Sequence, residues 1–289
     1  MDGLRKGAAA NGIVSLWIGL LLIVGSPSAH AADPADYGIV LMHGFGLRRE
    51  APRVYVRPHF PTDRLAEALR GEGFRVEQVE MPWSPNRLLD APIDKAMVEI
   101  DEHAKKLRAD GAKRIVVAGH SMGANMALAY GARREGVAAV IGLAPGHHPE
   151  LQARIFPELV DQFNQTRAAL EAGKGDRQQR FKGANCCPQF FAEFSSTPAI
   201  YWSYFNPAGD GSMAKNAQSL KPGVPVLWVL GKNDDIFGLL QKIGESYADY
   251  VPSRLPPNPN HRRVILDADH GKVPERSVPE VIEWLKRLP

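Results

Sequence analysis

The sequence predicts an α/β fold built around a mostly parallel sheet. Short apolar runs typical of strands alternate with helix-length amphipathic segments, which is the order expected of βαβ units. The chain has 289 residues, of which 44% are hydrophobic and 23% are charged, enough for one large domain with its own core. A long segment that interrupts the alternation indicates an insertion within this domain.

Six strands are expected, most of them from β-branched apolar runs of five to eight residues. The segment Phe74–Met81 is assigned from the alternation of apolar and polar residues instead. The expected strands are Tyr37–Met42, Phe74–Met81, Arg114–Ala118, Val137–Leu143, Val224–Leu230 and Arg263–Asp267.

Helices are expected between these strands, because apolar residues recur there at a spacing of three to four. Gly71 and Gly111 follow two of these segments, as glycines do at helix ends. The expected helices are Thr62–Gly71, Ile93–Arg108, Met122–Arg134 and Val278–Leu288.

The insertion is expected at about residues 147–222. A plain crossover needs only about a dozen residues, so a segment this long predicts a helical cap or lid, with Phe156–Leu170 as one helix. The stretch Gln189–Phe205 within it holds seven aromatic residues. These aromatic side chains are expected to line an apolar substrate pocket, to pack the insertion onto the sheet, or to do both.

The first 31 residues predict a signal peptide. Arg5 and Lys6 precede the apolar run 13–24, and the sequence 29–31 (AHA) offers the small residues that signal peptidase recognises. The run is too short to cross a bilayer comfortably. Cleavage is expected after Ala31, and the mature protein, residues 32–289, is expected to have no membrane span and to be periplasmic or secreted. An uncleaved N-terminal anchor is the alternative.

Composition and motifs argue against several other classes of protein. The net charge of +3 gives no sign of a nucleic-acid partner, and no glycine-rich phosphate-binding motif is present, so no cofactor is expected. The pair His147-His148 lacks a third ligand at a suitable spacing, so no metal is expected. Cys186 and Cys187 are adjacent, and their redox state is left open.

A G-x-S-x-G pentapeptide carries the predicted chemistry. Gly119-His120-Ser121-Met122-Gly123 follows a buried strand and precedes a helix, which is the context of a nucleophile elbow. A serine nucleophile needs a base, and the base needs an orienting acid. Asp234 and His270 follow the last two strands in the chain order that this arrangement requires, so the expected catalytic residues are Ser121, Asp234 and His270.

These segments resemble the α/β-hydrolase superfamily of serine hydrolases, which includes esterases and lipases. The resemblance covers nearly the whole chain after residue 31 and rests on HGFG at 43–46, GHSMG at 119–123, VLGKND at 229–234 and DADHG at 267–271. It implies the α/β-hydrolase fold. Larger members of the superfamily have two further strands before the strand that precedes the HGFG motif. These two strands are not expected here, because the predicted mature chain begins almost at that strand.

The resemblance also implies residue roles. The superfamily's spacing favours Asp234 over Asp235 as the acid, and the backbone N–H groups of Phe45 and Met122 would form the oxyanion hole. The neighbouring His43 and His120 are expected to hold loops by hydrogen bonds.

The expected activity is hydrolysis of a small-molecule carboxylic ester with an apolar acyl part, through an acyl-enzyme. An acyltransferase, a thioesterase or a peptidase would use the same three residues, and a non-catalytic binding protein of the same fold is a further alternative.

Overall fold

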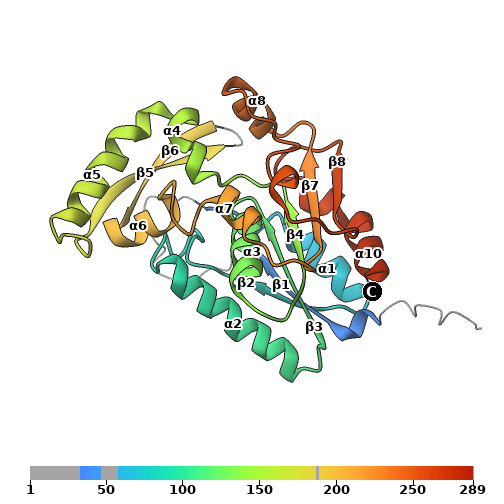
Figure 1. The fold of residues 1–289 in the computed structure, drawn as a ribbon. Coiled ribbons are helices and arrows are strands. Elements are labelled where there is room, and N and C mark those ends of the chain that lie inside the picture. Colours follow the sequence, from blue (N-terminus) through green and yellow to red (C-terminus); the bar gives the residue numbers. More distant parts are fainter. Residues whose placement is uncertain (1–32, 47–57, 187–188, 289) are drawn as a thin grey trace, which may run out of the picture. The chain divides into compact units, whose positions relative to one another are not determined.

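The central sheet has six strands, all parallel to their neighbours, in the spatial order β2-β1-β3-β4-β7-β8. The computed structural model describes residues 33–46, 58–186 and 189–288. Figure 1 shows the strands side by side with helices around them. All six predicted strands are present, with ends that shift by one or two residues in four of them. They are β1 (Tyr37–Met42), β2 (Arg75–Val79), β3 (Arg114–His120), β4 (Val137–Leu143), β7 (Val226–Gly231) and β8 (Arg262–Leu266).

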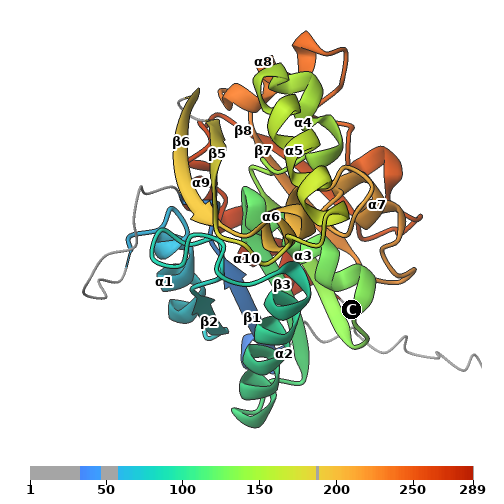
Figure 2. The same ribbon diagram turned by 90° about the vertical axis from the view of Figure 1, so that its left-hand side faces the viewer.

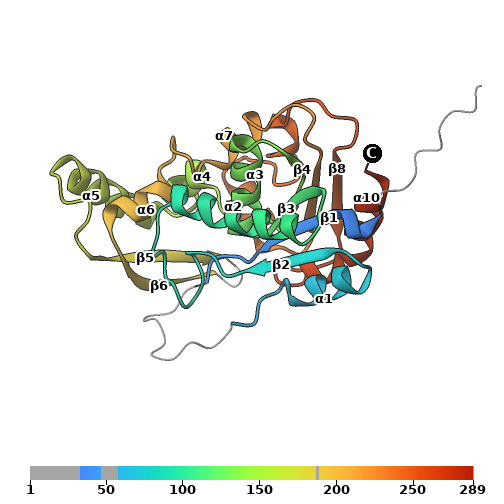
Figure 3. The same cartoon turned by 90° about the horizontal axis from the view of Figure 1, so that it is seen from below.

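Helices cover both faces of this sheet, which explains why its inner strands are apolar along their whole length. One buried cluster packs under α2 and α3, and a second packs under α1 and α10. Figure 3 shows α2 and α3 on one side of the strands and α1 on the other. These helices match the predicted ones, and their bounds are α1 (Asp63–Gly71), α2 (Ile93–Ala109), α3 (Met122–Arg133) and α10 (Val278–Arg287).

The order of the strands brings distant loops together. Strand β3 lies between β1 and β4, so the residues that follow β1, β3 and β4 emerge as neighbours. The loops after β7 and β8 lie next along the same edge, because these strands continue the sheet in parallel. Carboxyl ends of parallel strands meet at one edge, where ligands bind in open α/β sheets.

The insertion between β4 and β7 contains helices, as predicted, and also an antiparallel hairpin that was not predicted. The expected helix Phe156–Leu170 is interrupted near Pro157, and the long helix begins only at Val160, because proline lacks the N–H that a helix interior needs. Figures 1 and 2 show most of these elements grouped beyond one end of the sheet, whereas α7 packs beside α3. They are α4 (Pro149–Ile155), α5 (Val160–Glu171), β5 (Gln179–Cys186), β6 (Gln189–Ser196), α6 (Pro198–Phe205) and α7 (Met213–Gln218).

The insertion therefore combines the predicted helices with a hairpin that the sequence analysis missed. Strands β5 and β6 pair over eight residue positions, with Phe181 opposite Phe194. Both of these rings are buried, while their neighbours Lys182 and Glu193 are exposed. That alternation is the pattern of a half-buried strand, and it places an aromatic row against the rest of the insertion.

The aromatic cluster serves both of the expected purposes. Phe181 stacks on Tyr201 with ring centroids 4.4 Å apart, and Tyr201 stacks on Phe205 at 4.6 Å. Phe205 in turn lines the cavity beside Ser121. The insertion is tied to the segment before α2, since the Tyr204 hydroxyl donates to Ala91 O at 3.0 Å.

The predicted signal peptide and its cleavage site lie outside the described residues. Within the described ranges, no helix combines the length and the apolar character needed to cross a membrane.

Candidate active site

Ser121 occupies a sharp turn between β3 and α3. Its backbone has φ 54° and ψ −118°, a conformation that costs energy for a residue with a side chain. Two glycines make the turn possible. A Cβ on Gly119 would lie 2.1 Å from Gly123 O, and a Cβ on Gly123 would lie 2.6 Å from His43 O. Neither contact is sterically possible, so the glycines of the pentapeptide are required by the backbone, as the motif predicts.

Asp234 and His270 form a buried hydrogen-bonded pair. Asp234 Oδ2 lies 2.8 Å from His270 Nδ1, and the two residues are 3% and 8% exposed. Asp234 also caps α8 (Asp235–Lys242), since its Oδ1 accepts from Ile236 N–H at 3.0 Å. Asp235 is exposed. The structure thus brings Asp234, the favoured acid, to the histidine.

The pKa of the Asp234 carboxyl falls below its ordinary value. Burial raises this pKa, but the hydrogen bonds from His270, Ile236 N–H and the Tyr247 hydroxyl outweigh burial. Asp234 is therefore a carboxylate, which only accepts, so His270 Nδ1 carries the hydrogen of that contact.

Ser121 and His270 face the same small space beside Gly146, the third residue after β4. A Cβ on Gly146 would lie 2.8 Å from Ser121 Oγ and 3.2 Å from His270 Cε1. In the described part of the chain, Ser121 Oγ makes no hydrogen bond to His270. Such contacts are often long in sites without substrate, and a rotation about the Ser121 side chain is the adjustment that joins them.

The loop after β1 is held in place by His43. Its Nδ1 lies 2.6 Å from Gly44 O and its Nε2 accepts from Met81 N–H at 3.0 Å. Trp83 Nε1 donates to His43 O at 2.9 Å. Burial lowers the pKa of His43 to about 4, so the ring stays neutral with its hydrogen on Nδ1. This is the loop-holding role that the sequence predicts.

Two backbone donors on this loop and the elbow lack partners. Neither Phe45 N–H nor Met122 N–H makes a hydrogen bond to any described residue. Met122 is the first residue of α3, whose N-terminus favours negative charge. Phe45 and Met122 both line the cavity that Ser121 opens into. Two unpaired donors near a nucleophile are the arrangement that an oxyanion needs.

His120 ties the elbow to the loop that carries His270. Its Nε2 lies 3.0 Å from His270 O, and the two rings are 4.8 Å apart. Burial, reinforced by the nearby His270 ring, lowers the pKa of His120 to about 3. A neutral His120 therefore donates to His270 O, which again fits the predicted loop-holding role.

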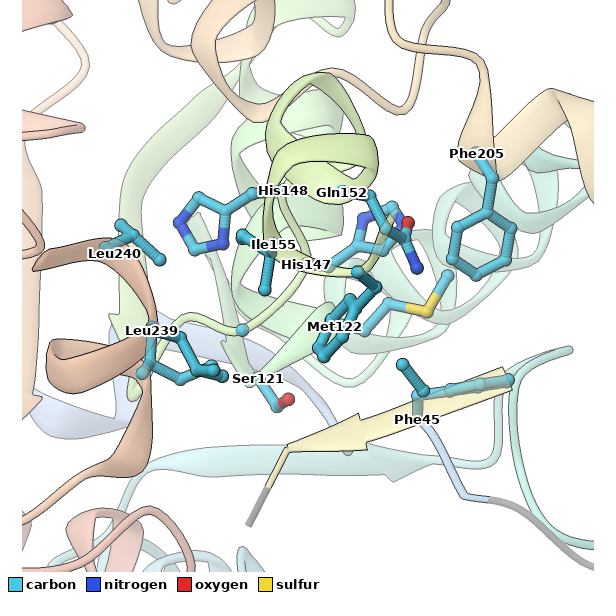
Figure 4. A pocket seen from close by; sticks show the side chains of 14 residues that line it. Phe45, Ser121, Met122, His147, His148, Gln152, Ile155, Phe205, Leu239 and Leu240 are labelled. Carbon is cyan, nitrogen blue, oxygen red and sulfur yellow. The ribbon is translucent and has the colours of Figure 1, made fainter. Parts of the chain in front are cut away.

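A cavity opens above Ser121. Figure 4 shows Ser121 at its base, with Leu239, Leu240 and His148 to one side and His147, Gln152 and Phe205 to the other. Its lining contains no charged side chain among the described residues, which suits an uncharged ligand. The lining residues are Phe45, Ser121, Met122, Gly146, His147, His148, Gln152, Ile155, Phe156, Ala184, Phe205, Ile236, Leu239 and Leu240.

Sequence reasoning missed several residues of this site. Tyr247 donates toward Asp234, and Gly146 leaves room between the serine and the histidine. Neither belongs to a motif, so the sequence offers no signal for either. The pair His147-His148 lines the cavity, and the described residues contain no group of three potential metal ligands.

The chain belongs to the alpha/beta hydrolase family. The model of that family matches residues 39–283, which span both the predicted elbow and the predicted histidine loop. The sheet order, the strained serine and the loops at one sheet edge agree with this assignment. A comparison with curated protein sequences finds no match.

Several solved structures share the fold at low sequence identity. A structure from work on LipS and LipT, two metagenome-derived lipolytic enzymes, has 14% identity and a TM-score of 0.56, covering 88% of this chain and 94% of that one. The monoacylglycerol lipase of Paleococcus ferrophilus has 18% identity and a TM-score of 0.53, with 87% and 95% covered. Est1E from Butyrivibrio proteoclasticus with bound ferulic acid has 17% identity and a TM-score of 0.52, with 88% and 91% covered.

Proposed function

We propose that this protein is a serine hydrolase that cleaves carboxylic esters through an acyl-enzyme. Ser121 is the nucleophile, His270 the base and Asp234 the acid that orients the base. One observation carries the proposal: the buried Asp234–His270 pair lies beside a serine held in a strained turn, at the base of a cavity that Phe45 and Met122 also line.

The hydrogen-bond pattern defines the direction of proton transfer. His270 Nδ1–H donates to Asp234, so Nε2 takes the proton from Ser121 Oγ as the oxygen attacks the ester carbonyl. The Phe45 and Met122 N–H groups receive the negative oxygen, and losing such a donor typically costs about 3 kcal/mol of transition-state stabilisation. His270 then protonates the leaving alcohol, and water releases the acid by the same route.

The cavity supports an ester whose acyl part is largely apolar and uncharged. Ile155, Leu239 and Leu240 provide an apolar wall, and no charge in the lining pairs with an ionised group. Lipolytic and feruloyl-binding proteins among the structural neighbours favour ester chemistry over peptide hydrolysis. Thioester hydrolysis and acyl transfer use the same residues and are separated from ester hydrolysis by substrate screening.

The first experiment tests the nucleophile. A fluorophosphonate probe should label the wild type and spare Ser121→Ala, while Ser219→Ala, a change at the end of α7 and outside the cavity lining, should leave labelling intact. Equal labelling of wild type and Ser121→Ala, or no labelling of either, would refute the proposal. A panel of p-nitrophenyl acyl esters, matched thioesters and acyl acceptors then assigns the reaction.

We also propose that the mature protein is exported to the periplasm or beyond. The support is the charged segment, apolar run and small residues at positions 1–31 of the sequence. N-terminal sequencing of periplasmic protein should start at Ala32. An intact Met1 in a membrane fraction would instead favour an uncleaved anchor.

A further inference from the structure

His147 lines the cavity above Ser121 and carries a buried ring nitrogen that has no hydrogen-bond partner among the described residues. The residue lies in the loop between β4 and α4, lines the cavity and is 7% exposed. Its Nε2 makes no hydrogen bond to any residue that the structure describes. Buried polar atoms without partners are uncommon in proteins and call for a physical explanation.

The tautomer of His147 follows from its neighbours. Asn125 Nδ2 lies 2.9 Å from His147 Nδ1 and 2.6 Å from Gly211 O. The Asn125 amide has this orientation because its Oδ1 accepts from Asn216 Nδ2 at 2.9 Å. Since an amide NH₂ only donates, His147 Nδ1 is the acceptor, and the hydrogen of the neutral ring is on Nε2.

The ring remains neutral at working pH. Burial, with a smaller contribution from the adjacent His148, lowers the pKa of His147 to about 3. The Nε2–H group is therefore a permanent neutral donor, which cannot lose its hydrogen or act as a cation. Phe205 lies edge-to-face with the His147 ring at 5.2 Å, and an aromatic ring is a much weaker acceptor than an oxygen.

A second polar group lies in the same part of the cavity. Gln152, on α4, lines the cavity, and Figure 4 shows its amide on the His147 side, away from Leu239 and Leu240. The cavity thus has a polar region formed by His147 and Gln152, while His148 lies on the side of Leu239 and Leu240.

We propose that His147 determines specificity by donating a hydrogen bond from Nε2 to an uncharged oxygen on the substrate. The oxygen belongs to the part of the ester that fills the cavity and is a hydroxyl, ether or carbonyl oxygen beyond the scissile group. A carboxylate is disfavoured, because the described lining contains no cation to pair with it. This inference rests on the proposed ester hydrolysis and adds the substrate class.

The test compares esters that differ in one atom. A series of p-nitrophenyl esters has acyl chains of equal length, in which an ether oxygen replaces one methylene at successive positions. Rates with hydroxide alone correct for intrinsic reactivity. At one position the wild type should show kcat/KM at least about tenfold above the all-carbon ester, since sites built to hydrogen-bond a substrate discriminate strongly against analogues without the partner.

Two substitutions at the same residue separate the donor from the shape of the ring. His147→Asn keeps a polar group near the position of Nδ1, where Asn125 donates, but removes the donor at Nε2. The ratio of kcat/KM between the preferred ether ester and the all-carbon ester should therefore fall to about one. His147→Gln places an amide NH₂ near the position of Nε2, so it should keep part of the preference. His103→Asn, a change at a half-exposed residue of α2 outside the cavity lining, should keep the wild-type ratio.

Each result bears on the inference. A wild type without any preferred oxygen position, or a preference that persists in His147→Asn, would overturn it. If His147→Asn does not fold, as judged by thermal melting, a folded His147→Gln variant that shows no preference at any oxygen position counts against it. Failure of the wild type to cleave even the all-carbon esters overturns the proposed function, and this inference with it.

Discussion

The hydroxyl of Tyr247 lies 3.1 Å from Asp234 Oδ2, the oxygen that also accepts from His270 Nδ1. The same hydroxyl lies 3.0 Å from Pro145 O, so a single hydrogen is shared between the loop after β4 and the acid. Tyr247 is buried in the loop that follows α8. It therefore links the proposed acid to the loop that carries Gly146 and His147.

Replacing Tyr247 tests this link. Tyr247→Phe removes one supporting hydrogen bond and leaves the ring packing, so kcat/KM on a p-nitrophenyl ester should fall about fivefold, the equivalent of about 1 kcal/mol. Tyr130→Phe removes a comparable hydrogen bond, from Tyr130 to Asp101 at 2.9 Å, far from the cavity lining. Steady-state kinetics of both variants provide the comparison, and equal losses would show that Tyr247 acts through stability alone.

The two adjacent acidic residues should behave very differently. Asp234→Asn removes the acceptor that sets the His270 tautomer, so kcat should fall about 10⁴-fold, as expected for the acid of a catalytic triad. Asp235→Asn alters an exposed side chain in the first turn of α8 and should change kcat less than about twofold. Circular dichroism confirms folding of both. A small loss for Asp234→Asn would contradict the proposed role.

The strained turn predicts a large effect of one methyl group. Gly119→Ala would place Cβ 2.1 Å from Gly123 O, so the elbow must shift or fail to form, with a loss of about 3 kcal/mol or more in the free energy of unfolding and of nearly all activity. Gly238→Ala is the matched control, because its Cβ meets nothing within 4 Å. It lies inside α8 and should stabilise the fold by up to about 1 kcal/mol. Urea unfolding of both variants measures the difference, and a well-folded, active Gly119→Ala would refute the geometry.

Burial of neutral histidines predicts a loss of stability in mild acid. The pKa of His120 is about 3 in the folded chain, below the ordinary value of 6.5, so only the unfolded chain takes up this proton between these pH values. The contribution of neutral His120 to the free energy of unfolding is complete above pH 6.5 and falls by up to about 1.4 kcal/mol per pH unit below that pH. His43, with a pKa of about 4, acts in the same direction. The lowered pKa of Asp234 destabilises the fold only in stronger acid, as the pH falls below its ordinary value of 3.8.

Urea unfolding at pH 7.5, 6 and 5 measures this effect in the wild type and in His120→Gln, which cannot titrate. The slope of the free energy of unfolding against pH should be smaller in the variant than in the wild type. The difference should correspond to the uptake of about one proton on unfolding, whatever the absolute stability of the variant. Identical slopes would show that His120 binds its proton equally in both states.

The strands of the sheet could be predicted because each one carries its own signal. Inner strands of a parallel sheet are buried on both faces, so Val137–Leu143 is apolar throughout and was predicted with its correct ends. The hairpin was missed because β5 holds Gly183, Ala184 and Asn185, which weaken the alternation of apolar and polar residues. Aromatic residues suit strands and buried helices alike, so the cluster 189–205 did not reveal where β6 ends and α6 begins.

The residues of the candidate site also fall into those that the sequence predicts and those that it does not. Ser121, Asp234 and His270 were found because each follows a recognisable strand in a set order, and the structure places all three at one edge of the sheet. Tyr247 and Gly146 were not found, because their importance depends on what lies opposite them in space. His147 was noted only as a possible metal ligand, and its free donor depends on Asn125, 22 residues earlier.

The sequence by itself determined the parallel sheet, the elbow and the order of the serine, acid and histidine loops, because these depend on local apolar patterns and on glycines that a tight turn requires. Only the tertiary structure decided which carboxylate meets His270, and which backbone N–H groups and ring nitrogens, His147 Nε2 among them, have no partner in the described part of the chain. Such properties arise from hydrogen bonds between segments far apart in the chain, and short-range patterns of residues carry no record of those partners.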